Sequence, residues 1–170
     1  MKGLVLLPVT AAMLLVARVE SCRPGPGSYM PTYQQLMQTA SLVLHGKDAA
    51  HIQVGSRTDS RFQVKCVLKN TNYLPVFRTI TIRHIAPGTS CPTYPTTQGT
   101  EYIVVLRRVP RTFNTYEWDT ASTGTFVSAA YEATPELLAT TMAICGFQNP
   151  TAPIFGQPRH CPATQASKKC

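Results

Sequence analysis

Alternating hydrophobic and polar residues mark the clearest β-strand of the chain, at residues 61–69. The apolar positions of this segment are Phe62, Val64, Cys66 and Leu68. They alternate with basic or polar residues, and a period of two is typical of a half-buried strand. The pattern therefore predicts that the Cys66 side chain points into the core and that Val67 is the one apolar residue on the outer face.

Other apolar segments predict further strands. β-Branched and apolar residues favour strands at 40–44, 77–84 and 101–108, and weaker ones at 112–118 and 125–130. Within 101–108 the run from Tyr102 to Leu106 is continuously apolar, which predicts burial on both faces. Residues 45–60, rich in glycine, aspartate and serine, are expected to form a loop.

Two helices are expected. Residues 32–38 predict a short one, and a second begins at Pro135, because Thr134 can cap it and Glu136 favours the positive end of its dipole. Gly146 marks its stop. Short strands followed by a closing helix predict a mainly β fold, a small closed barrel with a packed helix.

The N-terminus predicts export. Lys2 precedes an apolar run over residues 3–16, and small or modest side chains precede Cys22, so residues 1–21 are expected to be a cleaved signal peptide. The alternative is an uncleaved anchor, but an apolar run of about 14 residues is too short to cross a bilayer core of roughly 30 Å. We therefore expect a secreted protein without a membrane span.

The mature part contains all six cysteines. An even number of cysteines in an oxidising compartment predicts three disulfides, for which spacing alone leaves about 15 pairings open. The alternative is a metal site, but the chain has no C-x-x-C motif and its histidines are scattered. We expect no metal of its own and no cofactor.

The expected mature chain is basic, with 14 Lys and Arg against 7 Asp and Glu. This charge favours an acidic or sulfated polymer, or an acidic matrix protein, as a partner, and the extracellular compartment excludes nucleic acid. The candidate binding residues lie on or beside strands, and Arg61, Lys65 and Lys69 are expected on one outer strand face; the others are Arg78, Arg83, Arg107 and Arg108. The alternative for such a face is simple solvation.

No motif indicates catalysis. The chain has no G-x-S-x-G, no H-E-x-x-H and no glycine-rich phosphate loop after a strand. Each cysteine is better used in a bridge than as a nucleophile. We therefore expect no enzymatic activity and no catalytic residue.

An ordered set of short motifs resembles a known family. Cys22 stands at the expected mature N-terminus, Ala-Pro-Gly-Thr-Ser-Cys closes at Cys91, a tyrosine-led strand follows Gly99, and a capped helix leads to Cys145. This order resembles the netrin-type module shared by tissue inhibitors of metalloproteinases and the agrin N-terminal domain. The resemblance covers residues 22–147 and leaves a proline-rich tail at 148–170.

The resemblance implies a five-stranded OB-like Greek-key barrel with a short N-terminal helix and a packed C-terminal helix. It also implies a Cys22–Cys91 disulfide and, as in the agrin-like branch, a Cys66–Cys145 disulfide. Cys161 and Cys170 then remain for each other or for a second chain.

The resemblance implies two functions. The first is a secreted module that binds an extracellular matrix protein or polymer. The alternative is inhibition of a zinc metalloproteinase, in which the α-amine and carbonyl of Cys22 chelate the protease zinc and the inhibitory edge includes Arg23, Pro24, Ser90 and Cys91. The chain departs from the inhibitors because it lacks their C-x-C start and carries the long, charged Arg23 where they place a small residue.

Overall fold

The strands close into a five-stranded barrel in the computed structural model, which describes residues 31–55, 57–83, 96–119, 129–144, 146–147 and 149–162. The barrel strands are β1 (Leu42–Val54), β2 (Arg57–Asn70), β3 (Thr79–Arg83), β4 (Glu101–Arg108) and β5 (Thr115–Trp118). They are ordered β1-β2-β3-β5-β4, and β4 pairs back onto β1. All pairs are antiparallel except β3 with β5. The predicted mainly β, OB-like barrel is confirmed.

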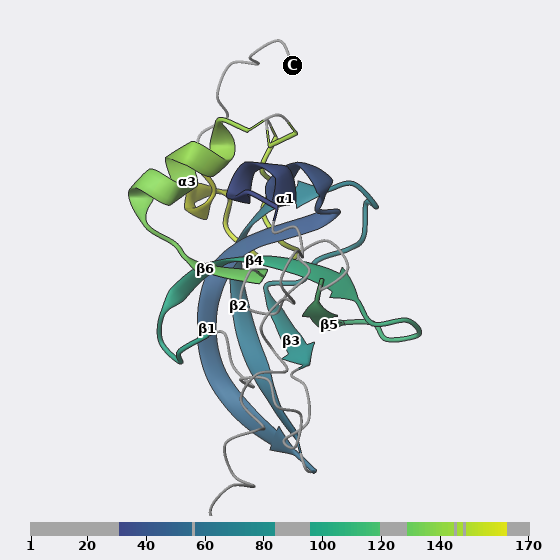
Figure 1. Ribbon diagram of the computed structural model, residues 1–170. Coiled ribbons are helices and arrows are strands. Elements are labelled where there is room, and N and C mark those ends of the chain that lie inside the picture. Colours follow the sequence, from purple (N-terminus) through teal and green to yellow (C-terminus); the bar gives the residue numbers. More distant parts are fainter. Residues whose placement is uncertain are drawn as a thin grey trace, which may run out of the picture.

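Three further elements and a short strand complete the fold. β6 (Ala130–Glu132) pairs with the outer side of β4, and helices α1 (Tyr33–Thr39) and α3 (Pro135–Met142) lie side by side over one end of the barrel (Figure 1). A hydrogen bond between Tyr33 and Thr141 joins the two helices. The last element is the 3-10 turn η3 (Pro158–His160).

Each helix begins where its sequence provides a cap. Thr32 accepts a hydrogen bond from the Gln35 amide, and the Gln35 side chain accepts one from the Thr32 amide, which forms a capping box. Thr134 caps α3 in the same position, with Pro135 in the first turn. The predicted start of this helix is therefore confirmed, and Gly146 follows its end with a φ of 96°.

The apolar residues form two cores. The barrel interior contains Phe62, Val64, Ile80, Ile82, Val104, Leu106, Tyr116 and Trp118. A second core lies between the outside of the barrel and the helices, and it contains Leu36, Met37, Val43, Leu68, Ile103, Val105, Met142 and Phe147. β4 contributes to both cores, as its continuous apolar run predicted.

The prediction of a loop at residues 45–60 is wrong, because β1 continues to Val54 and turns directly into β2. Figure 1 shows this long hairpin extending beyond the barrel. The pairing of the two strands has three irregularities, at Val43/Leu44, His45/Gly46 and Asp48/Ala50. Gly46 is required at the second, since a Cβ there would lie 2.4 Å from the Gln63 carbonyl oxygen. These bulges interrupt the alternation by which a strand is recognised.

Cys66 is buried, as predicted, but a bulge places it in a different core from Phe62 and Val64. Val64 pairs with Gly46 and Cys66 with the adjacent His45, so Lys65 is the extra residue on β2. After this point the faces exchange. Cys66 belongs to the second core, and Val67, expected outside, is buried in the barrel interior.

Cys66 forms a disulfide with Cys161, with the two Cα atoms 5.0 Å apart. The pairings Cys66–Cys145 and Cys161–Cys170 are therefore wrong. The physical reason is the path of residues 149–162, which run back along the barrel: Thr151 bridges Val67, and η3 lies beside β2. The chain thus brings Cys161 to the outer face on which the bulge places Cys66.

The expected Cys22–Cys91 disulfide and most of the weak strand at 125–130 lie outside the described residues. In the ranges that the structure covers, no helix is long and apolar enough to cross a membrane.

Candidate binding surface

Four of the seven candidate basic residues are engaged within the fold. Lys65 binds the Glu101 carboxylate, and Arg107 Nε lies 2.8 Å from Glu117 Oε1. Arg108 donates from Nε to the Thr112 carbonyl and from Nη2 to the Phe113 carbonyl, both at 2.9 Å. The fourth is Lys69. Of the expected row of Arg61, Lys65 and Lys69, only Arg61 has no partner among the described residues, because Lys65 and Lys69 are engaged within the fold.

Lys69 holds the end of α1. Its Nζ donates to the carbonyls of Met37 and Gln38, at 3.0 and 2.7 Å, and lies 5.6 Å from the centre of the Phe147 ring. A cation at this position satisfies carbonyls that a helix leaves without partners at its C-terminal end. Burial of the amine lowers the pKa of Lys69. Its role in this structure is therefore to fix α1 to β2.

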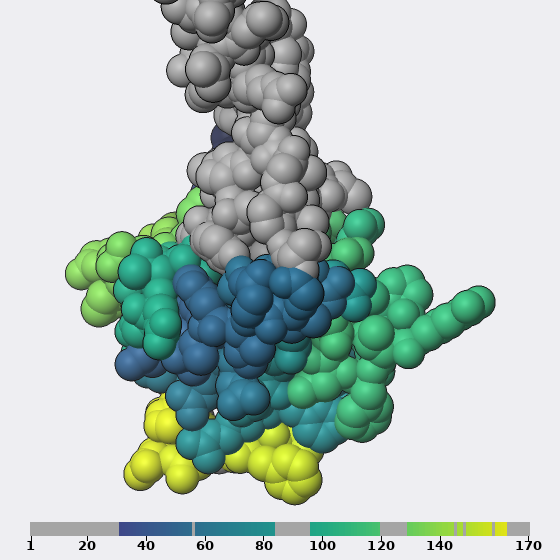
Figure 2. Space-filling model, turned by 90° about the horizontal axis from the view of Figure 1, so that it is seen from below, coloured from purple at the N-terminus to yellow at the C-terminus, as the bar shows by residue number. Residues whose placement is uncertain are grey.

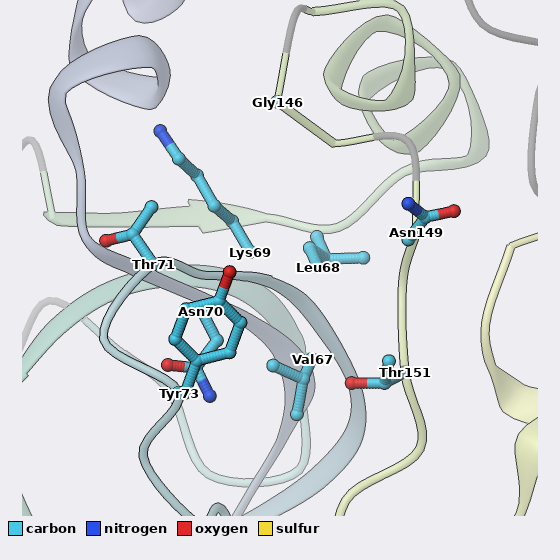
Figure 3. Close-up of a pocket in the computed structure, with 9 residues that line it drawn as sticks. All are labelled: Val67, Leu68, Lys69, Asn70, Thr71, Tyr73, Gly146, Asn149 and Thr151. Carbon is cyan, nitrogen blue, oxygen red and sulfur yellow. The ribbon is translucent and has the colours of Figure 1, made fainter.

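A half-open hollow of about 420 Å³ lies beside Lys69, between the end of β2 and the segment after α3 (Figure 3). Figure 3 shows the Lys69 side chain leading away toward α1, and the Tyr73 ring on the side of the β2–β3 connection. Asn70 and Thr71 also line the hollow, but they bond the carbonyls of Leu74 and Ser41. Its best polar groups are thus already used within the fold, and the hollow makes a poor ligand site.

The Glu101 carboxylate is shared between Lys65 and the imidazole of His45. Its Oε1 accepts from Lys65, and its Oε2 lies 3.2 Å from His45 Nε2. Burial alone would raise the pKa of Glu101, but Lys65 and His45 together hold it below its ordinary value. Burial lowers the pKa of His45 despite the neighbouring Glu101 carboxylate, and Lys65 and His160 lower it further.

These shifts predict that acid destabilises the fold in two steps. The folded state resists protonation of His45, so its contribution is present above pH 6.5 and is lost as the pH falls below that value. The contribution of Glu101 is present above pH 4.5 and is lost as the pH falls further. Urea unfolding of the wild type and of His45→Gln across this range tests the prediction. The variant should lose the first step and keep the second, and an unchanged first step would contradict it.

Asp48 is buried beside two hydroxyl groups and one imidazole group on the β1–β2 hairpin. Its Oδ2 lies 2.8 Å from His51 Nε2 and accepts from Thr96 at 2.6 Å and from Ser60 at 3.3 Å. In a catalytic triad the histidine stands between the carboxylate and the nucleophile. Here His51 and Ser60 both bond the same carboxylate oxygen, an arrangement that ties β1, β2 and residue 96 together.

Arg61, Arg78 and Arg83 remain of the candidates. Arg61 on β2 lies opposite Thr81 on β3, and Arg83 is two residues farther along β3. The register places Arg83 between Asp59 and Glu117, so acidic side chains surround it. Arg61 and Arg78 are exposed, and within the described ranges their guanidinium groups make no hydrogen bond or ion pair. These two arginines are therefore the available charges.

The residues of the implied inhibitory edge, Cys22, Arg23, Pro24, Ser90 and Cys91, lie outside the described residues. Among the residues that are described, no group of three His, Cys, Asp or Glu side chains could hold a metal ion. Phe113 and Phe155 are exposed aromatic residues that the sequence pattern did not indicate as candidates. Phe113 lies within the weak strand predicted at 112–118, next to Asn114, and Phe155 precedes a glycine in the proline-rich tail, so neither position indicated exposure.

Comparison with known proteins gives no family: no protein-family model matches the chain, and no curated protein matches it.

Proposed function

We propose that this chain is a secreted netrin-type module that binds a sulfated or acidic component of the extracellular matrix. The observation that carries this proposal is that two of the predicted binding residues, Arg61 and Arg78, are exposed and have no hydrogen bond or ion pair within the described residues. The disulfide between Cys66 and Cys161 supports the extracellular location, because disulfides persist mainly in oxidising compartments.

Arginine suits this role for a physical reason. The planar guanidinium group is charged at every physiological pH and pairs with sulfate or carboxylate through two parallel hydrogen bonds. Exposed pairs of this kind are screened by salt over about 10 Å at 0.1 M ionic strength. Binding should therefore weaken as salt is raised.

Heparin chromatography tests the proposal with two matched double variants. We expect Arg61→Gln/Arg78→Gln to elute from immobilised heparin at lower salt than the wild type, because it removes cations that have no internal partner. The control is Arg57→Gln/Arg107→Gln, which lowers the net charge by the same amount but removes arginines already paired with Asp59 and Glu117. The control should elute close to the wild type.

Two outcomes would contradict the proposal. If the wild type passes through heparin at low salt, the surface does not bind polyanions. If both double variants shift equally, only the net charge matters and the two arginines form no site.

The alternative proposal, inhibition of a zinc metalloproteinase through Cys22, is supported by the sequence resemblance alone. It is tested by assaying a metalloproteinase with the protein before and after acetylation of the α-amine. Inhibition that is absent, or that survives acetylation, would reject it.

A further inference from the structure

Three phenylalanine side chains form one aromatic cluster on the outside of the barrel. Phe77 precedes β3, Phe113 lies in the β4–β5 connection and Phe155 lies in the C-terminal segment. The centre of the Phe77 ring is 5.0 Å from that of Phe113 and 6.3 Å from that of Phe155. Phe113 is 66% exposed and Phe155 is 83% exposed. We call these three residues the phenylalanine surface.

Backbone contacts hold the three segments together. The Ile154 amide donates to the Val76 carbonyl at 2.7 Å, and the Arg78 amide donates to the Ile154 carbonyl at 2.9 Å. On the other side, the Asn114 side-chain amide donates to the Thr79 carbonyl at 2.6 Å. Figure 2 shows the yellow C-terminal segment against the teal strands, with the green β4–β5 connection projecting beside them. The rings are therefore presented in a fixed arrangement, which reduces the entropy lost on binding.

Backbone strain marks the same segments. Phe155 and Arg111 have φ values of 62° and 61°, in the left-handed region that bulky side chains seldom adopt. Such conformations persist only where the surroundings fix them, and they concentrate at functional sites. Phe155 thus combines this backbone conformation with an apolar ring that is largely exposed.

The surroundings of the phenylalanine surface are basic. Its three segments, residues 71–79, 108–114 and 149–157, contain Arg78, Arg108 and Arg111 and no acidic residue. Arg108 holds two carbonyls of the β4–β5 connection and lies 6.0 Å from the Phe113 ring. In the described part of the chain, the side chains of Arg78 and Arg111 have no partner, so both can receive a carboxylate.

We propose that the phenylalanine surface docks another extracellular protein through a segment in which an apolar side chain is flanked by carboxylates. This proposal rests on the proposed extracellular role and identifies a surface and a partner chemistry for it. Aromatic residues and arginine are the residue types that contribute most to protein–protein binding. The rings would receive the apolar side chain, and Arg78 and Arg111 the carboxylates.

Charge disfavours two other occupants. A second copy would bring the same arginines against each other. The chain's own residues 22–30 and 163–170 contain Arg23, Lys168 and Lys169 and no acidic residue, so they lack the complementary charge. A glycan is also less suitable, because phenylalanine offers no hydrogen bond to its hydroxyl groups.

The test uses the full mature protein and synthetic peptides. The probe peptide carries a leucine or phenylalanine flanked by aspartates, and a control peptide of equal charge carries alanine at the apolar position. Fluorescence polarisation should show that the wild type binds the probe more tightly than the control. Phe113→Ser/Phe155→Ser should weaken binding of the probe about tenfold or more. Val54→Ser, an exposed apolar residue at the tip of the β1–β2 hairpin, should change nothing.

Each outcome decides between the proposals. Equal binding of both peptides, no binding of the probe, or an unchanged affinity of the double phenylalanine variant would overturn the docking surface. Heparin retention of the double phenylalanine variant tests the polyanion proposal independently, because this variant keeps both Arg61 and Arg78. If the phenylalanine variant loses heparin and keeps the peptide, the surface binds glycans and the protein-docking proposal is wrong. Amide chemical shifts of the wild type should move in residues 76–79, 109–115 and 152–156 on probe binding.

Discussion

Replacing Cys66 and Cys161 together by alanine should lower the free energy of unfolding by about 4–5 kcal/mol. The two residues are 95 positions apart, so their bridge removes many conformations from the unfolded chain. The loss is a large share of the net stability of an ordinary domain, about 5–15 kcal/mol. We expect a folded but strongly weakened protein, measured by urea unfolding of the double variant against the wild type.

Two measurements accompany this variant. Peptide mapping of the non-reduced wild type should recover residues 66 and 161 in one linked fragment. The single variant Cys161→Ala should lose about as much stability as the double variant, since either change opens the same loop. A loss below about 1 kcal/mol in the double variant would show that the bridge constrains the unfolded chain little.

Phe62→Ala should cost about 3–5 kcal/mol, because it removes a large ring from the barrel interior. Phe62 is 0% exposed and packs in the cluster that all five barrel strands line. The strands around it are held by closed hydrogen bonding, so they can move little toward the cavity. Urea unfolding measures the loss, and circular dichroism establishes that the variant still folds.

Phe113→Ala is the matched control, with the same substitution at an exposed ring. Phe113 is 66% exposed and contacts Phe77 and Arg108 at the surface, so its removal should cost under about 1 kcal/mol. Comparable losses in the two variants would mean that the barrel interior is not the main source of stability.

Regular pattern accounts for what the sequence predicted correctly. The strand predicted at 101–108 matches β4 residue for residue, and its apolar run from Tyr102 to Leu106 is buried throughout, because a strand buried on both faces needs no polar interruption. The cap at Thr134 fixed the start of α3, since capping depends on neighbours within one turn. The pattern predicted a small closed barrel, but its five strands and their Greek-key order were expected only through the family resemblance.

Irregular strand pairing explains the features that the sequence pattern did not predict. Residues 45–54 belong to a strand, but bulges displace their side chains from a period of two. The same kind of irregularity at Lys65 turned Cys66 from the barrel interior to the second core. The disulfide could not be predicted because it depends on the path of residues 149–162, which carry no periodic pattern of their own.

The sequence predicted that basic residues would lie on the surface, but not which of them would be free to bind a partner. Clustering of arginine and lysine indicated a basic surface, but sequence alone could not tell which charges face a carboxylate after folding. Lys65 on β2 binds Glu101 on β4, across the intervening strand β1, and Arg107 binds Glu117 on the neighbouring strand β5. Lys69 binds carbonyls at the end of α1. The candidates that stay free to bind a partner are arginines that have no acidic residue opposite them in the strand register.

The disulfide between Cys66 on β2 and Cys161, directly after η3, also affects how the protein responds to proteolysis. A nick anywhere between residues 66 and 161 leaves both pieces covalently joined. The fragments should therefore separate on a denaturing gel only after a thiol reductant is added. A cleaved molecule therefore stays one covalently linked molecule, with its C-terminal piece attached to the barrel through the disulfide.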